Sequence, residues 1–127
     1  MTKEWEKAVL TGNAEKVREL LEAGANINSL DRYGQTAIMK AAHKGHLQVV
    51  RLLVERGADL DHTAKFGLSA LMLAVITDHP EVVELLVASG ANTAIRGSSR
   101  SMIYAYTALE LAQQMGRSRC AEILSQK

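Results

Sequence analysis

The stretch Leu20-Leu-Glu-Ala-Gly24-Ala-Asn26 returns as Leu53-Val-Glu-Arg-Gly57-Ala-Asp59 and again as Leu86-Val-Ala-Ser-Gly90-Ala-Asn92. Both intervals between the glycines are 33 residues. A fixed period of this length is typical of a stack of small repeated units, in which each unit packs only on its neighbours. Because such a stack exposes a long surface, the period favours binding over catalysis.

Length and composition fit one domain. The chain has 127 residues, of which 47% are hydrophobic, so it can bury a substantial core, and with only 4% aromatic residues that core must be aliphatic. The formal net charge of +1 predicts neither nucleic-acid binding nor attraction to a membrane. The single cysteine, Cys120, cannot form an internal disulfide, which favours a reducing compartment. With no apolar run near the roughly 20 residues of a membrane span and a charged N-terminus, we expect a cytoplasmic or nuclear protein.

Each unit carries two stretches with helical periodicity. The first is predicted over residues 36–42, 69–75 and 107–113. Thr or Ser opens each of them as an N-cap, and Thr107-x-x-Glu110 fits a capping box. The second is predicted over 47–54 and 81–87, where apolar residues three and four apart form one stripe. Each unit is therefore expected to be helix, short turn, helix and extended turn.

The ends of the second helices also carry suitable residues. Asp78 is expected to cap the helix of the third unit, with Pro80 in the first turn, where proline is tolerated. Glycine follows the second helix at 24, 57 and 90 and suits a left-handed C′ position.

These features resemble the ankyrin repeat family over nearly the full length of the chain. The residues that carry the resemblance are Asp31-x-x-Gly34-x-Thr36-Ala-Ile, Gly45-His46-Leu-Gln-Val-Val-Arg-Leu-Leu53 and Gly57-Ala-Asp59-Leu-Asp61. The resemblance implies an all-α fold, an ankyrin repeat solenoid of four stacked helix-turn-helix units with β-turn fingers. The sequence departs from the family where its histidine is replaced, by Met39, Met72 and Glu110. The family's usual threonine–histidine hydrogen bonds are therefore not expected, although the hydroxyls can still cap.

We expect a single domain over residues 1–127, with units at approximately 1–30, 31–63, 64–96 and 97–127. The outer positions of the end units are polar where those of the middle units are apolar: Lys16 and Glu19 align with Val49 and Leu52. Polar outer faces are typical of terminal repeats. This pattern predicts four units, the first lacking its finger, with no missing repeat.

The last unit has five extra residues, which lengthen its finger over 96–106. The end of this segment is apolar and aromatic and includes Met102, Ile103, Tyr104 and Tyr106. Exposed aromatics on an inserted loop often contact partners. The alternative is that these residues fold back and seal the last unit, since Met102 and Ile103 are costly to expose.

In ankyrin proteins the fingers and first helices line a concave binding face. Carried over to this chain, that face comprises Arg32, Tyr33, Gln35, Lys40, His43, Lys44, Lys65, Phe66, Leu68, Leu73, Ile76 and Thr77, with Tyr104 and Tyr106 from the long finger. The part from the second unit is basic and the part from the third is apolar. The outer positions of the second helices instead carry acids, namely Glu15, Glu22, Glu55, Glu81 and Glu84. We therefore expect a protein or peptide partner with acidic residues flanking an apolar anchor. The alternative is an ordinary solvated face.

Motifs for chemistry are not found. The sequence has no phosphate-binding Gly-x-x-x-x-Gly-Lys-Ser/Thr and no Gly-x-Ser-x-Gly elbow. Asp59, Asp61 and His62 within one turn are interpreted as solvated or capping residues rather than metal ligands. Cys120 and Trp5 align with apolar core positions and are expected to be buried. We expect no catalytic residue, metal or cofactor.

The sequence thus predicts a monomeric, non-catalytic protein–protein interaction module, similar to small stand-alone ankyrin repeat proteins. Two alternatives remain: an enzyme with an unrecognised site, and a weak nucleic-acid binder that uses the basic second repeat. The family resemblance also implies one modification, because many ankyrin proteins are hydroxylated on an asparagine at the position of Asn28.

Overall fold

The computed structural model describes residues 1–98 and 105–126. These residues form eight α-helices and one 3-10 turn, and no strand occurs among them. The elements are α1 (Lys3–Leu10), α2 (Ala14–Glu22), α3 (Ala37–Lys44), α4 (Leu47–Glu55), η1 (Lys65–Gly67), α5 (Ala70–Ile76), α6 (Pro80–Ala88), α7 (Ala108–Gln114) and α8 (Ser118–Ser125). The expected all-α fold is confirmed. Within this part of the chain, no helix has the length and apolarity needed to cross a bilayer.

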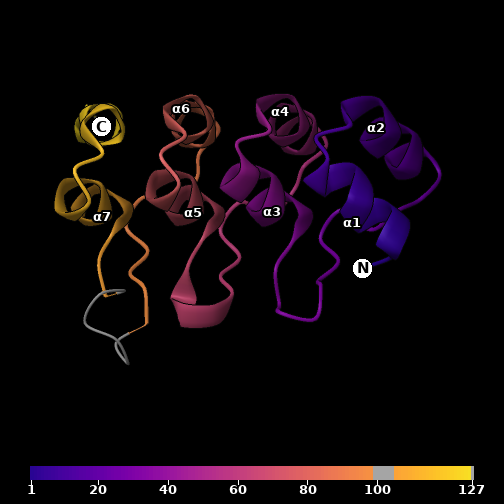
Figure 1. Cartoon of the computed structure of the whole chain (residues 1–127), viewed down its shortest axis with the longest axis horizontal. Coiled ribbons are helices and arrows are strands. Elements are labelled where there is room, and N and C mark those ends of the chain that lie inside the picture. The colour runs from indigo at the N-terminus through magenta and orange to yellow at the C-terminus, as the bar shows by residue number, and fades with distance from the viewer. Residues whose placement is uncertain (99–104, 127) are drawn as a thin grey trace.

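The helices stack as pairs in serial order. α1 packs on α2, α3 on α4, α5 on α6 and α7 on α8. The odd-numbered helices also contact one another along one row and the even-numbered helices along a second row (Figure 1). The connections between pairs project as fingers from the odd-numbered row, on the side away from the even-numbered row (Figure 1). We call them finger 1 (residues 26–36), finger 2 (59–69) and finger 3 (92–107, of which 99–104 lie outside the described residues).

Hydroxyl N-caps begin the helices that follow the fingers. The side chains of Thr36, Ser69 and Thr107 accept the backbone N–H three residues on, at 3.5, 3.3 and 3.3 Å. Glu110 completes the predicted capping box, because its Oε1 accepts the backbone N–H of Thr107 at 3.1 Å. The caps form although methionine or glutamate replaces the family's histidine.

Glycine ends three of the second helices as predicted. Gly24, Gly57 and Gly90 all have positive φ, between 82° and 99°. At Gly24, the glycine N–H donates to the carbonyl of Leu21 (3.1 Å) and the next N–H, of Ala25, to that of Leu20 (2.9 Å). These two hydrogen bonds satisfy two carbonyls at the end of the helix. A residue with a Cβ would be strained at the position of Gly24.

The core is a continuous aliphatic seam between the two rows of helices. Its largest fully buried side chains include Ile38, Leu53, Leu71 and Leu86. Trp5 and Cys120 are also buried, as predicted. Burial, followed by the carboxylate of Asp78, raises the pKa of the Cys120 thiol to about 11. The thiol is therefore protonated at neutral pH and packs as a small apolar group.

Exposure differs between the middle and the end of the stack in the predicted direction. Val49 and Leu52 are buried, whereas Glu19 at an equivalent position is exposed and Lys16 is half-buried. Lys16 and Glu19 form an ion pair across 3.8 Å. The outer surface of the first pair is therefore polar.

The prediction that Asp78 caps α6 is wrong. Asp78 adopts a left-handed conformation (φ 59°) and ends α5, where its N–H donates to the carbonyl of Val75 at 3.0 Å. His79 is the N-cap residue of α6 and makes no side-chain capping bond. Pro80 does occupy the first turn as predicted. Asp78 therefore takes the place that glycine fills at the corresponding turn of the preceding pair, Gly45.

Candidate protein-binding site

Finger 1 is a tight turn organised by the carboxylate of Asp31. The Gly34 N–H donates to the Asp31 carbonyl at 3.0 Å, and Asp31 N–H donates to the Gln35 carbonyl at 2.9 Å. Asp31 Oδ1 accepts the backbone N–H groups of Tyr33 (2.8 Å) and Gln35 (2.9 Å), and Oδ2 is ion-paired with Lys40 on α3. Burial by itself raises the pKa of Asp31, but the bonds from Lys40 and the two N–H groups hold the pKa below its usual value. The turn is thus held by a charged, nearly enclosed side chain.

Finger 2 makes its turn without that carboxylate. The equivalent residue is Ala64, whose carbonyl accepts the Gly67 N–H at 2.9 Å and whose N–H donates to the Leu68 carbonyl at 3.1 Å. Phe66 has φ 66° and ψ 13°, a left-handed conformation that residues with a Cβ rarely adopt, and Gly67 follows with φ 70°. The turn therefore places an aromatic residue where glycine is usually found.

The tips of the two fingers carry the same pair of side-chain types. The guanidinium of Arg32 lies 5.1 Å from the centroid of the Tyr33 ring, and the ammonium of Lys65 lies 5.1 Å from that of Phe66. The Tyr33 side chain is 63% exposed and that of Phe66 41%. Each tip thus displays an aromatic ring beneath a cation, an arrangement worth about 0.5–1 kcal/mol at an exposed site.

A chain of hydrogen bonds fixes the starts of successive fingers to one another. Asn28 Oδ1 accepts the N–H of Asp59 at 3.0 Å, and Asp61 Oδ1 accepts the N–H of Asn92 at 2.8 Å. Asp59 Oδ1 in turn accepts the N–H of Asp61 at 3.0 Å. The two aspartates therefore act as caps, as the sequence indicated. Asn28 keeps its exposed position, and its hydroxylation stays a prediction.

His62 joins the two fingers nearer the helices. Its Nε2 lies 2.9 Å from the carbonyl oxygen of Gly34, so the ring nitrogen donates across the gap between the fingers. Since His62 is half-buried, its hydrogen-bonded side chain fills the space between the fingers and makes that space polar. The two tips are consequently held in a fixed relation.

Basic side chains lie on these tips and in the last turn of α3. Arg32, Lys44 and Lys65 are exposed, and none of them forms an ion pair within the described part of the chain. Burial lowers the pKa of His43, and the positive charges of Lys44, His79 and Lys40 lower it further. His43 is therefore neutral at pH 7. We define the finger face as Arg32, Tyr33, His43, Lys44, Lys65 and Phe66.

Three other residues predicted for this face lie beneath it. Lys40 is 11% exposed and its charge is used by Asp31, so it is not offered to a partner. Leu68 and Leu73 are 9% and 8% exposed and belong to the core. The prediction that these two leucines line a surface for a partner is therefore wrong, because both side chains pack in the core.

The remaining predicted residues are half-buried or not described. The N–H of Gln35 is bonded to Asp31, and the hydroxyl of Thr77 donates to the Leu73 carbonyl at 2.7 Å. Ile76 and Tyr106 both pack against the core. The position of Tyr106 agrees with the sealing alternative for the long finger. Tyr104 lies outside the described residues, and so do Met102 and Ile103.

The described parts of finger 3 are tied down by Arg96. Its guanidinium is 3.0 Å from the Glu110 carboxylate and donates to the Ala105 carbonyl at 3.2 Å. The Ser98 N–H donates to the Phe66 carbonyl at 2.6 Å, so finger 3 also contacts finger 2. Finger 2 thus has a neighbour on the side away from finger 1.

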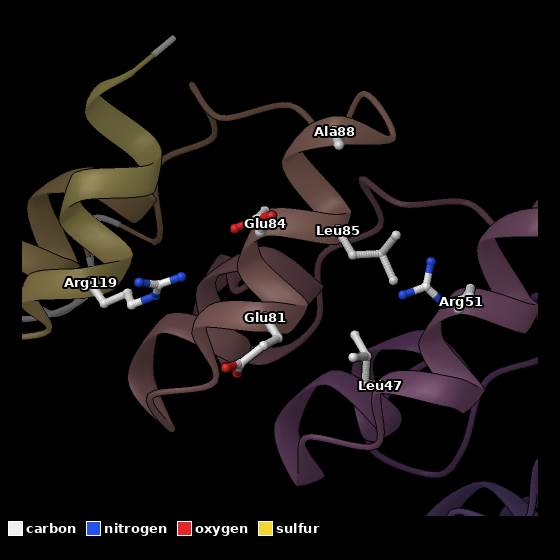
Figure 2. Close-up of a pocket in the computed structure, with 7 residues that line it drawn as sticks. All are labelled: Leu47, Arg51, Glu81, Glu84, Leu85, Ala88 and Arg119. Atoms are coloured by element: carbon white, nitrogen blue, oxygen red, sulfur yellow. The ribbon is translucent and has the colours of Figure 1, made fainter.

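A second surface lies on the outer row of helices. A shallow groove of about 370 Å³ separates α4 from α6 and reaches α8, and its lining is Leu47, Arg51, Glu81, Glu84, Leu85, Ala88 and Arg119 (Figure 2). Arginine and glutamate side chains both border it (Figure 2). Arg51 and Arg119 lie among the glutamates of this groove, so this part of the outer row carries both signs of charge. Of the two surfaces, the finger face is the one that concentrates one sign of charge beside exposed aromatics.

Comparison with protein families agrees with this architecture. Residues 6–97 and 61–127 match the family model described as ankyrin repeats (3 copies). A comparison with curated proteins gives no match.

Proposed function

Since the chain belongs to the ankyrin repeat family, whose members are generally protein–protein interaction modules, we propose that it binds an acidic partner protein through the finger face. The observation that carries this proposal is the repeated tip: Arg32 with Tyr33 on one finger, and Lys65 with Phe66 on the next. Aromatic residues and arginine are enriched where protein interfaces concentrate their binding energy. The basic residues have no counter-charge in the described structure, which favours a partner that supplies carboxylates.

The backbone of Phe66 supports this assignment. A non-glycine residue in the left-handed region costs about 1–2 kcal/mol, and such residues cluster at functional sites. Glycine at this position would remove that cost. A binding contact is a role that fits a ring in this conformation that is 41% exposed and lies beside the ammonium of Lys65.

Among the described residues, no titrating group favours the enzyme alternative. The carboxylates with lowered pKa, Asp31 and Glu110, accept backbone N–H groups and pair with cations that hold turns and caps. The thiol of Cys120 is buried and protonated. Each shift has a structural cause, and these groups lie in different parts of the stack. The outer groove between α4 and α6 is shallow and open, as expected for a surface that contacts solvent or another macromolecule.

The experiment compares Tyr33→Ala/Phe66→Ala with the wild type by affinity capture and quantitative mass spectrometry. Partners that the wild type enriches should fall at least tenfold with the double variant. Arg51→Ala/Arg119→Ala is the control, because it removes two exposed cations from the outer groove. Circular dichroism checks that all three proteins are folded. Equal capture by the aromatic variant and the wild type would rule out the finger face as the binding site.

We extend the proposal to the oligomeric state of the protein and to its location in the cell. A monomer is proposed because the polar outer side of the first helix pair offers no apolar surface for a second copy. A cytoplasmic or nuclear location is proposed because the only cysteine, Cys120, is a buried free thiol. Analytical ultracentrifugation and fluorescence microscopy of the tagged chain test these two statements.

A further inference from the structure

The two fingertips form a pair of equivalent half-sites, and the following inference rests on the proposed function of the finger face. Arg32 and Lys65 are one repeat apart, as are Tyr33 and Phe66. Because the helix pairs stack in series and the fingers project to the same side, the two tips lie next to each other along the stack (Figure 1). A ligand that crosses them meets a cation and a ring twice.

Stack geometry sets the spacing of the ligand groups. Packed helices lie about 8–10 Å apart, so neighbouring tips repeat at about that distance. A β-strand places side chains on one side every second residue, about 7 Å apart, and every fourth, about 13 Å apart. Neither interval equals one repeat. A polyproline II segment has three residues per turn and rises about 3.1 Å per residue, so residues i and i+3 lie on one side about 9 Å apart.

A helical ligand fits the distance between the tips but does not fit the surface between them. Residues i and i+7 of an α-helix are about 10 Å apart on one side. Helices, however, bind in grooves with a continuous apolar floor. Between the two fingers half-buried His62 is bonded to the Gly34 carbonyl, so the surface there is polar. Narrow extended segments can bridge separate aromatic tips without such a floor.

Charge selects the residues beside the anchors. Arg32 and Lys65 lie over their rings, so an apolar side chain against either ring brings its chain neighbours close to a cation. Exposed ion pairs contribute little to affinity, and they act mainly on specificity and association rate. Lys44, the last residue of α3, is a third exposed cation.

We propose that the finger face binds an extended acidic segment in polyproline II conformation that runs along the stack, with apolar residues i and i+3 against Tyr33 and Phe66 and acidic residues next to them. The segment is recognised by this spacing and charge.

A displayed library of random 12-residue peptides tests the spacing directly. Selection on the wild type should enrich peptides of negative net charge in which two apolar or proline residues are separated by three positions. Selection on Tyr33→Ala or on Phe66→Ala should lose the preference for that separation. Selection on Arg32→Ala/Lys65→Ala should lose the preference for acids, whereas the outer-groove control Arg51→Ala/Arg119→Ala should keep both.

Synthetic peptides from the selection give the magnitude. In fluorescence anisotropy, moving one anchor so that the separation becomes two should weaken binding at least tenfold, and raising the salt concentration from 50 to 300 mM should weaken it severalfold. Enrichment of a separation of seven in helical peptides, enrichment with no acidic bias, or no binder that depends on the finger face would overturn the inference. Binders that need both rings at any separation would overturn it while leaving the proposed function standing.

Discussion

Finger 1 and finger 2 reach similar tips by different internal supports. In finger 1 the carboxylate of Asp31 accepts two backbone N–H groups and pairs with Lys40 on the following helix. In finger 2 the equivalent residues are Ala64 and Leu73. Neither the side-chain hydrogen bonds to the backbone nor the ion pair can therefore form. What the two fingers share is the exposed ring beneath a cation. The support varies while the tip is retained, which is the pattern expected when the tip has a role of its own.

The neighbours of the two fingers differ as well. The carbonyl of Phe66 in finger 2 accepts the N–H of Ser98, so finger 2 packs against finger 3. Space beside Gly34 in finger 1 is open, whereas a Cβ on Gly67 would meet the Ser98 nitrogen at 2.9 Å. Finger 1 is therefore supported from within by charge, and finger 2 from outside by packing.

The largest effect is expected from breaking the support of finger 1. Asp31→Ala removes the oxygen that accepts two backbone N–H groups and leaves Lys40, which is 11% exposed, without its counter-charge. Loss of one partner of an enclosed pair is costly, and we expect the free energy of unfolding to fall by about 3 kcal/mol. Urea denaturation followed by circular dichroism measures it.

The matching control converts finger 1 to the chemistry of finger 2. Asp31→Ala/Lys40→Leu reproduces the pair Ala64 and Leu73, and it should recover at least half of the loss because no unpaired charge remains. If the double variant is less stable than Asp31→Ala alone, the ion pair is not the support of finger 1.

A second prediction compares the stability lost when each glycine that follows an aromatic ring, Gly34 or Gly67, is replaced by alanine. Gly34 and Gly67 have φ of 77° and 70°, so alanine is strained at both by about 1 kcal/mol. At Gly67 the new Cβ would also press on backbone atoms of Gly97 and Ser98. Gly67→Ala should therefore lower the free energy of unfolding by about 2 kcal/mol and Gly34→Ala by about half as much, again by urea denaturation. Equal losses would mean that finger 3 yields and does not support finger 2.

Acid should weaken finger 1 through the protonation of Asp31. The pKa of Asp31 is lower in the folded protein than its ordinary value of 3.8. The stability that this carboxylate supplies is thus fully present above about pH 4 and is lost as the pH falls through the lower folded value. In urea titrations from pH 6 to pH 2.5, the difference in stability between the wild type and Asp31→Asn should shrink below pH 4. A difference that stays constant over this range would exclude the ionised carboxylate as its source.

Much of this fold follows from the sequence because its signals are local. The hydroxyl caps at Thr36, Ser69 and Thr107 and the glycines after the second helices depend on neighbouring residues, and the period of 33 can be read directly from the chain. The prediction that Asp78 caps α6 was wrong because it depended on the backbone geometry of a turn. An aspartate before Pro80 is typical of an N-cap, and only the turn geometry shows that it ends the preceding helix with positive φ.

The site was harder to predict because it depends on burial between units. The sequence indicates an exposed cation at Lys40 and carries no signal that Asp31, nine positions earlier, encloses its charge. Leu68 and Leu73 were placed on the surface for the same reason, since a repeat alignment gives the position of a residue but not the depth of its side chain. The exposed rings and cations of the tips were expected from the sequence, although the left-handed backbone of Phe66 was not.

The left-handed backbone of Phe66 gives the smallest and most specific test of the comparison between finger 1 and finger 2. Replacing the ring by alanine or glycine removes the same side-chain contacts, so the difference between the two variants reports the backbone alone. At Phe66, where φ is 66°, glycine should be more stable than alanine by about 1 kcal/mol. At Tyr33, which is not among the described residues with positive φ, glycine should be less stable than alanine by about 0.5–1 kcal/mol. Thermal and urea denaturation of the four variants measures both differences. All four should bind the partner equally poorly, because each lacks one ring. An alanine variant at Phe66 that is as stable as the glycine variant, or more stable, would contradict the strain argument for a binding role of Phe66.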